Sequence, residues 1–167
     1  MAREIPLTQG KVAIVDDEDY DVLAKNKWMA LKSRKGVFYA ARMITVGYKK
    51  QNLLRMHCVI LPPTPGMTVD HIDRDGLNNR RSNLRLANGS QQRANRSRRD
   101  GCRSKYRGVT RHRNKWYARI TKDGARIDLG LYHIEEDAAR AYDAAAAQLH
   151  GEFANLNFPN QRGLINV

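Results

Sequence analysis

Val69-Asp70-His71-Ile72-Asp73 and Asn83-Leu84-Arg85-Leu86 are the two stretches that decide the fold of this 167-residue chain. Their β-branched and leucine residues favour two short strands, and Asp75-Gly76 between them is a turn signal. Asn88-Gly89-Ser90 then suits the start of a helix over Gln91 to Arg98. The pattern predicts a strand, a polar loop, a returning strand and a helix.

Asp70 and His71 are the first candidates for chemistry in this pattern. A carboxylate is a hard oxygen ligand that suits Mg²⁺, and a neutral histidine can accept a proton from water. Hydrolysis of a phosphodiester uses both groups. On a regular strand the two side chains would point to opposite faces, whereas a bulge would let them converge. On residue types alone, a purely structural Asp-His pair remains the commoner case.

The wider pattern resembles the HNH endonucleases of phages and introns over residues 53–98. It includes His57, Leu77-Asn78-Asn79-Arg80 and the segment from Ser90 to Arg96. The resemblance implies a ββα-metal fold with one divalent ion, Mg²⁺ or Mn²⁺. It implies that His71 is the general base and that Asp70 is a metal ligand. Asn83 would brace the loop that carries His71 through hydrogen bonds from its side chain to the backbone.

Two positions leave alternatives open. Where the family usually has His or Asn on the helix, this chain has Gln92, whose carbonyl oxygen could serve as the second metal ligand on a longer arm. Asn95, one helical turn further on, is the alternative ligand. His57 matches a recurrent histidine of the family outside the metal pair, and its alternative is a histidine of the core.

The balance of charge points to a polyanionic partner. The chain has 30 Lys and Arg against 17 Asp and Glu, a net charge of +13. From Arg93 to Arg126 there are 13 basic residues, opposed only by Asp100 and Asp123, with aromatic residues between them. A membrane-surface helix does not fit, because three residues would break it: Gly108, Asn114 and Gly124. Nucleic acid is therefore the favoured partner, and double-stranded DNA the expected one.

Other classes are disfavoured by what the sequence lacks. Neither Cys58 nor Cys102 has a Cys or His at metal-ligand spacing on both sides, and both are expected to be unpaired thiols. No stretch approaches the roughly 18 apolar residues of a membrane span, and the first residues do not resemble a signal peptide. We expect no membrane partner, no small-molecule cofactor and a cytoplasmic location. The resemblance adds a bacterial host cell and a gene carried by a phage or a mobile element.

Residues 105–158 carry a second pattern. Apolar and polar residues alternate over 106–110, 116–121 and 125–130, with turn residues between them, which predicts a three-stranded antiparallel meander. Glu135 to Leu149 is strongly helical and Gly151 suits its end. One face of that helix is apolar: Ala138, Ala141, Tyr142, Ala145 and Leu149.

This second pattern resembles the plant APETALA/ethylene-response-factor DNA-binding domain over residues 105–159. Tyr106-Arg107-Gly108-Val109, the stretch from Trp116 to Ile120, and Asn157-Phe158-Pro159 keep the family's register. The resemblance implies a sheet backed by one helix, with the sheet face in the major groove. Thr110 and Asp128 depart from the plant pattern, so the plant target sequence is not carried over.

The sequence also predicts which side chains meet DNA. We expect Arg107, Arg119 and Arg126 to share the outer sheet face with Thr121 and Asp128. Arginine is the best bidentate reader of guanine and also binds phosphate. The full predicted set is Arg107, Arg111, Arg113, Trp116, Arg119, Thr121 and Arg126, with Arg93 and Arg96 along the backbone of the DNA. Trp116 stays open between the core and DNA contact, and Tyr142 is expected in the core.

The first 56 residues show short strands and no chemistry. We expect a strand over Lys11–Val15, a helix over Asp19–Lys27, and a hairpin whose strands are 37–41 and 43–46, with Gly47.

The predicted fold class is therefore α+β, in five parts. These are a strand-rich scaffold (1–52), the nuclease motif (53–98), a linker (99–104), the DNA-binding domain (105–159) and a tail (160–167). The predicted function is a site-specific DNA endonuclease, a monomer or weak dimer, that nicks one strand. The alternatives are a catalytically inactive, sequence-specific DNA-binding regulator and a protein that binds RNA.

Overall fold

The structure is a computed structural model that describes residues 1–48, 50–96 and 103–159. It divides into two compact units, Met1–Asn88 and Gly89–Val167. The linker predicted at 99–104 falls inside the second unit, and most of it, with Cys102, lies outside the described residues. The predicted tail, 160–167, also lies outside them. Each unit is described by itself below.

The first unit begins with a two-stranded hairpin and a three-stranded sheet. β1 (Ala2–Pro6) pairs antiparallel with β2 (Val12–Asp16) across the short 3-10 helix η1 (Thr8–Gly10), and α1 (Asp17–Ala24) follows. The three-stranded sheet consists of β3 (Met29–Lys32), β4 (Phe38–Thr45) and β5 (Gln51–Arg55), with β4 in the middle. α2 (Met56–Ile60) comes directly after β5.

The hairpin predicted within residues 37–46 is wrong in one respect. Residues 38–45 form the single strand β4, because the apolar and β-branched residues on both sides of Arg42 all fit one extended strand. The chain reverses later, where the Val46 amide donates to the Lys50 carbonyl at 2.7 Å. Gly47 supplies the positive φ of 68° that this turn uses.

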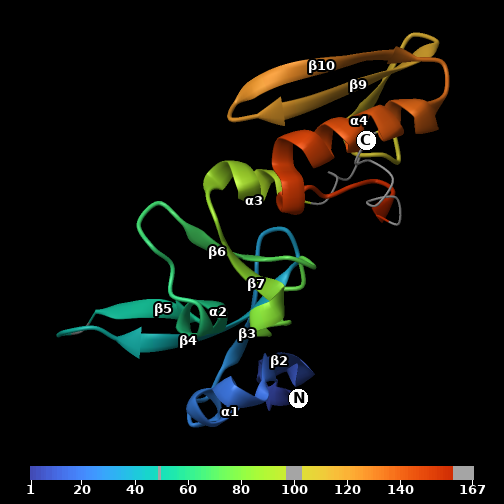
Figure 1. The fold of residues 1–167 in the computed structure, drawn as a ribbon. Helices are drawn as coiled ribbons and strands as arrows, with labels where there is room; N and C mark the ends of the chain where they lie inside the picture. The colour runs from blue at the N-terminus through green and yellow to red at the C-terminus, as the bar shows by residue number, and fades with distance from the viewer. Residues whose placement is uncertain (49, 97–102, 160–167) are drawn as a thin grey trace. The chain divides into compact units, whose positions relative to one another are not determined.

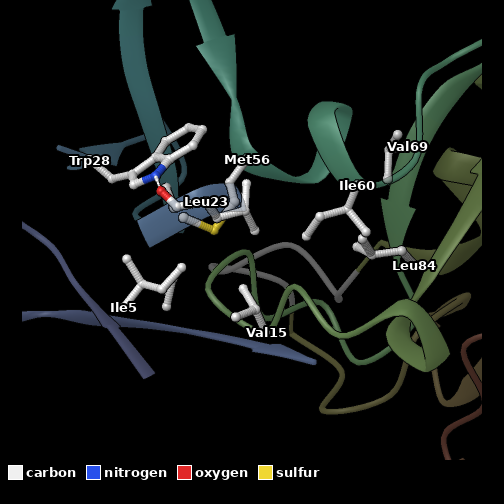
Figure 2. Packing of buried hydrophobic residues seen from close by; sticks show 10 residues of the cluster. Ile5, Val15, Leu23, Trp28, Met56, Ile60, Val69 and Leu84 are labelled. Carbon is white, nitrogen blue, oxygen red and sulfur yellow. Dashed lines mark hydrogen bonds between the residues drawn. The ribbon is translucent and has the colours of Figure 1, made fainter. Parts of the chain in front are cut away.

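The strands of the predicted nuclease motif complete the first unit. β6 (Thr68–His71) pairs antiparallel with β7 (Leu84–Ala87), and the 3-10 helix η2 (Arg81–Asn83) leads into β7. Both strands share one core with the N-terminal elements (Figure 2). That core gathers Ile5, Val15, Leu23, Trp28, Ala40, Met56, Ile60, Val69 and Leu84. Buried residues from the first 52 positions therefore pack in one core with the strands that follow.

The second unit contains a three-stranded sheet backed by one helix, as predicted. β8 (Val109–His112), β9 (Lys115–Lys122) and β10 (Ala125–Tyr132) form an antiparallel meander of order β10-β9-β8. α4 (Glu135–His150) lies along one face of this sheet (Figure 1) and is followed by η3 (Gly151–Phe153). The same unit includes α3 (Gly89–Asn95), the helix of the nuclease motif. The α+β class is confirmed.

Short-range sequence signals explain these elements. Asp123 and Gly124 both have positive φ, 49° and 88°, and close the two-residue turn between β9 and β10. The buried residues of α4 are Ala138, Ala139, Tyr142, Asp143 and Ala146, so its inward stripe lies close to the predicted one. The Lys122 ammonium donates to the Leu149 carbonyl and satisfies one of the carbonyls at the end of α4.

A buried aspartate connects the two ends of the region from Arg107 to Phe158 to α4. Asp143 is 2% exposed and accepts hydrogen bonds from the Asn157 and Phe158 amides, both at 2.8 Å. Asn157 in turn accepts from the Arg107 amide at 2.7 Å. Burial raises the pKa of Asp143, although these two amide donors act to lower it.

Among residues 1–48, 50–96 and 103–159, no helix is both long and apolar enough to cross a bilayer.

Candidate active site

The loop between β6 and β7 is held by aspartate side chains that bond to the backbone ahead of them. Asp73 Oδ1 accepts from the Asp75 amide at 2.8 Å, and Asp75 Oδ1 accepts from the Leu77 amide at 3.0 Å. Two successive Asx turns of this kind fold a polar loop without a core of its own. Arg74, between these two aspartates, has a positive φ of 70°. The loop directly after His71 therefore has a fixed backbone.

Asn83 clamps this loop from its far end. Its Oδ1 accepts from the Asp73 amide at 3.0 Å. Its Nδ2 donates to Asp73 Oδ1 and to the Asn78 carbonyl, both at 2.8 Å. These are hydrogen bonds of the kind that the resemblance implied for Asn83, from the side chain to the loop that follows His71.

His71 lies at the end of β6 and is 5% exposed. Its Nε2 is 3.3 Å from Asn79 Oδ1. Burial lowers the pKa of His71 below its ordinary value, while the bond to Asn79 and nearby carboxylates, Asp73 and Asp70 among them, act to raise it. A histidine in this state is neutral at neutral pH, the form that can take up a proton.

The structure brings His57 next to His71. The two ring centroids are 4.9 Å apart with nearly perpendicular planes, and Tyr39 stands 5.8 Å from His57 and 5.9 Å from His71. Within the described residues, His57 Nδ1 is buried without a hydrogen-bond partner. Burial, with the nearby His71 and Arg55, lowers the pKa of His57 to about 3. His57 is thus a buried neutral ring that packs edge-on against the candidate base.

Asp70 lies on the other face of the strand from His71. β6 is regular here, with Asp70 opposite Arg85 and His71 opposite Leu84. Asp70 Oδ2 accepts from Arg85 Nη2 at 3.2 Å and from Arg85 Nε at 3.3 Å. The side chain of Asp70 is 14% exposed. The bulge that would make the two side chains converge is absent from this pair of strands.

The donor types fit Mg²⁺ better than Zn²⁺. Within the described parts of the chain, no group of three or more His, Cys, Asp or Glu residues is placed to hold a metal ion. Mg²⁺ needs only one or two carboxylates and keeps several waters, whereas zinc sites use three or four nitrogen and sulfur ligands. The carboxylate of Asp70 is a ligand of the magnesium type, and so is the amide oxygen that Gln92 or Asn95 offers.

Gln92 and Asn95 belong to α3, in the second unit, whereas Asp70, His71, Asn83 and His57 belong to the first. Gln92 is half-buried and Asn95 is 6% exposed. The choice between them as metal ligand stays a prediction. Two hydrogen bonds within the second unit hold the end of the α3 segment. Arg107 Nη2 donates to the Arg93 carbonyl at 2.8 Å, and Asn155 Nδ2 donates to the Arg96 carbonyl at 2.9 Å.

The outer face of the C-terminal sheet carries part of the predicted DNA-binding set. Val109 and Ala118 are buried against α4, and strand residues alternate between the two faces. Arg119, Thr121, Arg126 and Asp128 therefore share the opposite, exposed face, with Arg119 opposite Asp128 and Arg126 opposite Thr121. Asp128 also bonds to the Tyr117 hydroxyl and raises the pKa of that group.

The prediction that Arg107 shares this outer face is wrong. Arg107 precedes β8, and its Nε donates to the hydroxyl of Tyr142, a buried residue of α4. Gly108 makes this approach possible, because a Cβ there would lie 1.9 Å from the Tyr142 ring. Tyr142 itself is in the core, as expected.

The remaining predicted DNA contacts lie elsewhere in the second unit. Arg111 pairs with Trp116, so the two side chains lie on the α4 side of the sheet, and the Arg111 guanidinium stands 4.8 Å from the Trp116 ring centroid. Trp116 is half-buried and packs against the core, which favours the core alternative for it. Arg113 is exposed in the turn after β8, and Arg93 and Arg96 are exposed at the end of the α3 segment.

Two residues to which the sequence pattern assigned no role contact the candidate site: Asn79 contacts His71, and Arg85 contacts Asp70. Asn79 lies in the segment Leu77–Arg80 and Arg85 in the segment Asn83–Leu86, so their position within the nuclease pattern could have marked them as candidates. What the sequence did not reveal is which atoms they bond.

Comparison with known proteins supports the nuclease pattern. A family profile described as HNH endonuclease matches residues 61–94. An uncharacterized HNH endonuclease of Acanthamoeba polyphaga mimivirus is 32% identical over 151 residues, which cover 89% of this chain and 76% of that protein.

Plant transcription factors match a shorter part of the chain. An AP2-like ethylene-responsive transcription factor of Arabidopsis thaliana is 47% identical over 68 residues, covering 34% of this chain and 22% of that protein. An AP2/ERF and B3 domain-containing protein of Oryza sativa subsp. japonica is 47% identical over 57 residues, covering 34% of this chain and 16% of that protein. The chain thus spans only a small part of these plant proteins.

Proposed function

Because this chain belongs to the HNH endonuclease family and carries an AP2-like DNA-binding region, we propose that it nicks double-stranded DNA with His71 as general base. The observation that carries the proposal is the position of His71. It ends β6, is kept neutral by burial, and precedes a loop whose backbone Asn83 clamps. A base of this kind must be both deprotonated and fixed in place.

In the proposed reaction, His71 takes a proton from water, and the resulting hydroxide attacks phosphorus in line. The 3′ oxygen leaves and takes a proton from solvent water, so the products are a 5′-phosphate and a 3′-hydroxyl. Asp70, with Gln92 or Asn95, would hold one Mg²⁺ or Mn²⁺ ion. When bound, such an ion supplies positive charge that stabilises the scissile phosphate and the leaving oxygen. Asn83 keeps the loop after His71 in one conformation.

The C-terminal sheet would supply most of the DNA affinity through its outer face. Arg119 and Arg126 are exposed there beside Thr121. Arg93 and Arg96 would follow the DNA backbone. One active site per chain gives a nick, and a double-strand break would need a second copy or a second event. We further propose that a phage or mobile element encodes the protein and that it acts in the cytoplasm of a bacterial host.

A DNA-binding regulator without catalysis is the second candidate. Two observations favour it: Gln92 stands where the family usually has His or Asn, and the Asp70 carboxylate is already paired with Arg85. Such a protein would bind DNA with the same steep dependence on salt but would ignore Mg²⁺.

Nicking of supercoiled plasmid separates the two candidates. The wild type, His71→Ala and Asp70→Asn are incubated with Mg²⁺ or Mn²⁺ and with EDTA. His133→Ala, an exposed histidine of the second unit, is the matched control. We expect metal-dependent nicking by the wild type and the control, and its loss in both site variants. Absence of cleavage on DNA that the protein binds would favour the regulator.

A further inference from the structure

Asn79 is fully buried, and its amide group has two fixed partners in the first unit. Its Oδ1 lies 3.3 Å from His71 Nε2, and its Nδ2 donates to the Leu77 carbonyl at 3.1 Å. The Leu77 carbonyl determines which way the amide points. If the amide were turned over, two oxygens would face each other inside the protein, and a buried acceptor would be left without a donor.

This orientation decides where the proton of His71 sits. An amide oxygen can only accept, so the group opposite Asn79 Oδ1 must donate, and Nε2 therefore carries the hydrogen. A neutral imidazole has one N–H, and the lone pair then belongs to Nδ1. A histidine with the other tautomer would place two acceptors against each other at this contact.

Asn79 is itself held by the N-terminal scaffold. The backbone N–H of Asn79 donates to the Ile14 carbonyl at 2.7 Å, and the backbone N–H of Ile14 donates to the Leu77 carbonyl at 2.9 Å. Residues 77–79 thus run as a short parallel bridge along β2. Two arginines that follow are paired with acidic residues at the end of β2 and in α1. Arg80 lies 3.1 Å from Asp16, and Arg81 lies 2.7 Å from Asp19.

We propose that Asn79 is a positioning residue that holds His71 as the tautomer protonated at Nε2, so that Nδ1 receives the proton of the attacking water. The proposal rests on the proposed role of His71 as general base. When the water proton moves to Nδ1, the imidazolium keeps its Nε2 hydrogen on Asn79 Oδ1. That hydrogen bond is then charge-assisted and stronger. The N-terminal scaffold, through β2 and the carboxylates of Asp16 and Asp19, thereby serves the nuclease by fixing Asn79.

The tautomer is measured by nitrogen NMR of the whole, metal-free protein at about pH 8, where an ordinary histidine is neutral. The signals of His71 are those missing from His71→Gln. We expect Nε2 to carry the hydrogen and Nδ1 to be unprotonated, with this tautomer predominating. A protonated Nδ1, or an even mixture of the two tautomers, would overturn the proposal whatever the Asn79 variants do.

Variants then connect the tautomer to the rate. Asn79→Leu removes the hydrogen-bond acceptor of His71 while keeping a side chain of similar volume. We expect this variant to show a mixture of the two His71 tautomers. Its kcat for nicking should be about 10–100-fold lower than that of the wild type, with little change in KM. Asn79→Asp keeps an acceptor toward His71 and should retain the Nε2 tautomer, with a kcat well above that of Asn79→Leu. Its second oxygen faces the Leu77 carbonyl, so this variant should be less stable than the wild type. The matched control is Asn26→Leu, since Asn26 Oδ1 accepts from Arg42 in the same unit, away from His71.

The outcomes separate this proposal from the proposed function. If the wild type does not nick DNA but shows the Nε2 tautomer, the nuclease assignment fails and the Asn79 contact stands. If the wild type nicks DNA and Asn79→Leu folds and nicks equally fast, the role of Asn79 is wrong and that of His71 stands. An Asn79→Leu protein that fails to fold leaves the decision to the wild-type spectrum and to Asn79→Asp.

Discussion

The side-chain amide of Asn83 both accepts a hydrogen bond from Asp73 and donates one to it. It accepts from the Asp73 backbone and donates to the Asp73 carboxylate. Asn83 Oδ1 accepts from the Asp73 amide at 3.0 Å while Asn83 Nδ2 donates to Asp73 Oδ1 at 2.8 Å. An amide is the side chain that can do both at once, since a carboxylate offers only acceptors. This pair joins the two ends of the loop that begins two residues after His71.

The substitution Asn83→Asp should therefore do more damage than its size suggests. The new oxygen would face Asp73 Oδ1 and the Asn78 carbonyl, two acceptors that now bond to Nδ2. We expect the free energy of unfolding of the first unit to fall by about 2–4 kcal/mol, and nicking to fall with it.

Chemical denaturation at two pH values tests this. The loss relative to wild type should be smaller near pH 4 than at pH 8, because protonation of the introduced carboxylate restores a donor. Asn114→Asp, in the exposed turn after β8, is the control for adding a charge. Equal losses at both pH values would speak against the acceptor clash.

His57 should make the first unit sensitive to acid. In the unfolded chain this histidine takes up a proton below about pH 6.5, whereas in the folded protein burial keeps it neutral down to a pKa of about 3. The unfolded state therefore binds more protons in this window. The contribution of His57 to the free energy of unfolding is therefore fully present above about pH 6.5, the pKa of the histidine in the unfolded chain. It is lost as the pH falls toward a pKa of about 3, by roughly a few kcal/mol in all.

The check compares His57→Leu with wild type and with the exposed His133→Leu between about pH 7 and pH 4. His57→Leu should flatten the dependence of the unfolding free energy on pH, even if it changes stability at neutral pH. Trp28, buried in the first unit, reports the transition by fluorescence in a Trp116→Phe background. A slope unchanged by His57→Leu would show that other groups cause the acid sensitivity.

Gly108 and Gly124 offer a matched pair of alanine substitutions in the second unit. Both have positive φ, 74° and 88°. A Cβ at Gly108 would lie 1.9 Å from the Tyr142 ring, whereas nothing lies within 4 Å of one at Gly124. Gly124→Ala should cost about 1–2 kcal/mol from backbone strain alone. Gly108→Ala should cost roughly 3 kcal/mol or more, because the ring must also move. Similar melting temperatures for the two variants would contradict this packing.

Arg119 should contribute to sequence recognition if the outer sheet face meets DNA. Arg119→Ala is expected to weaken specific binding by about 1–3 kcal/mol and to relax the preference at one base position. Arg140→Ala, on the exposed side of α4, removes the same charge from another face and should change affinity less. Binding titrations against a randomised DNA library measure both effects. Equal weakening on every sequence would mean that Arg119 touches only phosphate.

What the sequence predicts well here is local. The Asp123-Gly124 turn and the alternation in β9 follow from neighbouring residues, whereas the expectation for Asn83 came from the family resemblance. Arg107 was misplaced because it stands before β8, where alternation does not yet apply. The contact of Asn79 with Ile14 joins residues 65 positions apart, and no pattern in either segment encodes it.

The hydrogen bonds that hold the α3 segment also limit how the parts of this protein can be exchanged. Arg107 and Asn155, both from the DNA-binding region, bond to the Arg93 and Arg96 carbonyls. A chimera joined at residue 104, with a foreign DNA-binding domain after it, would leave those carbonyls without these donors. One joined at Gly89 would carry the helix together with the residues that hold it. Retargeting this nuclease by recombination should therefore succeed more often at the second junction, where the helix and the C-terminal sheet are inherited as one piece.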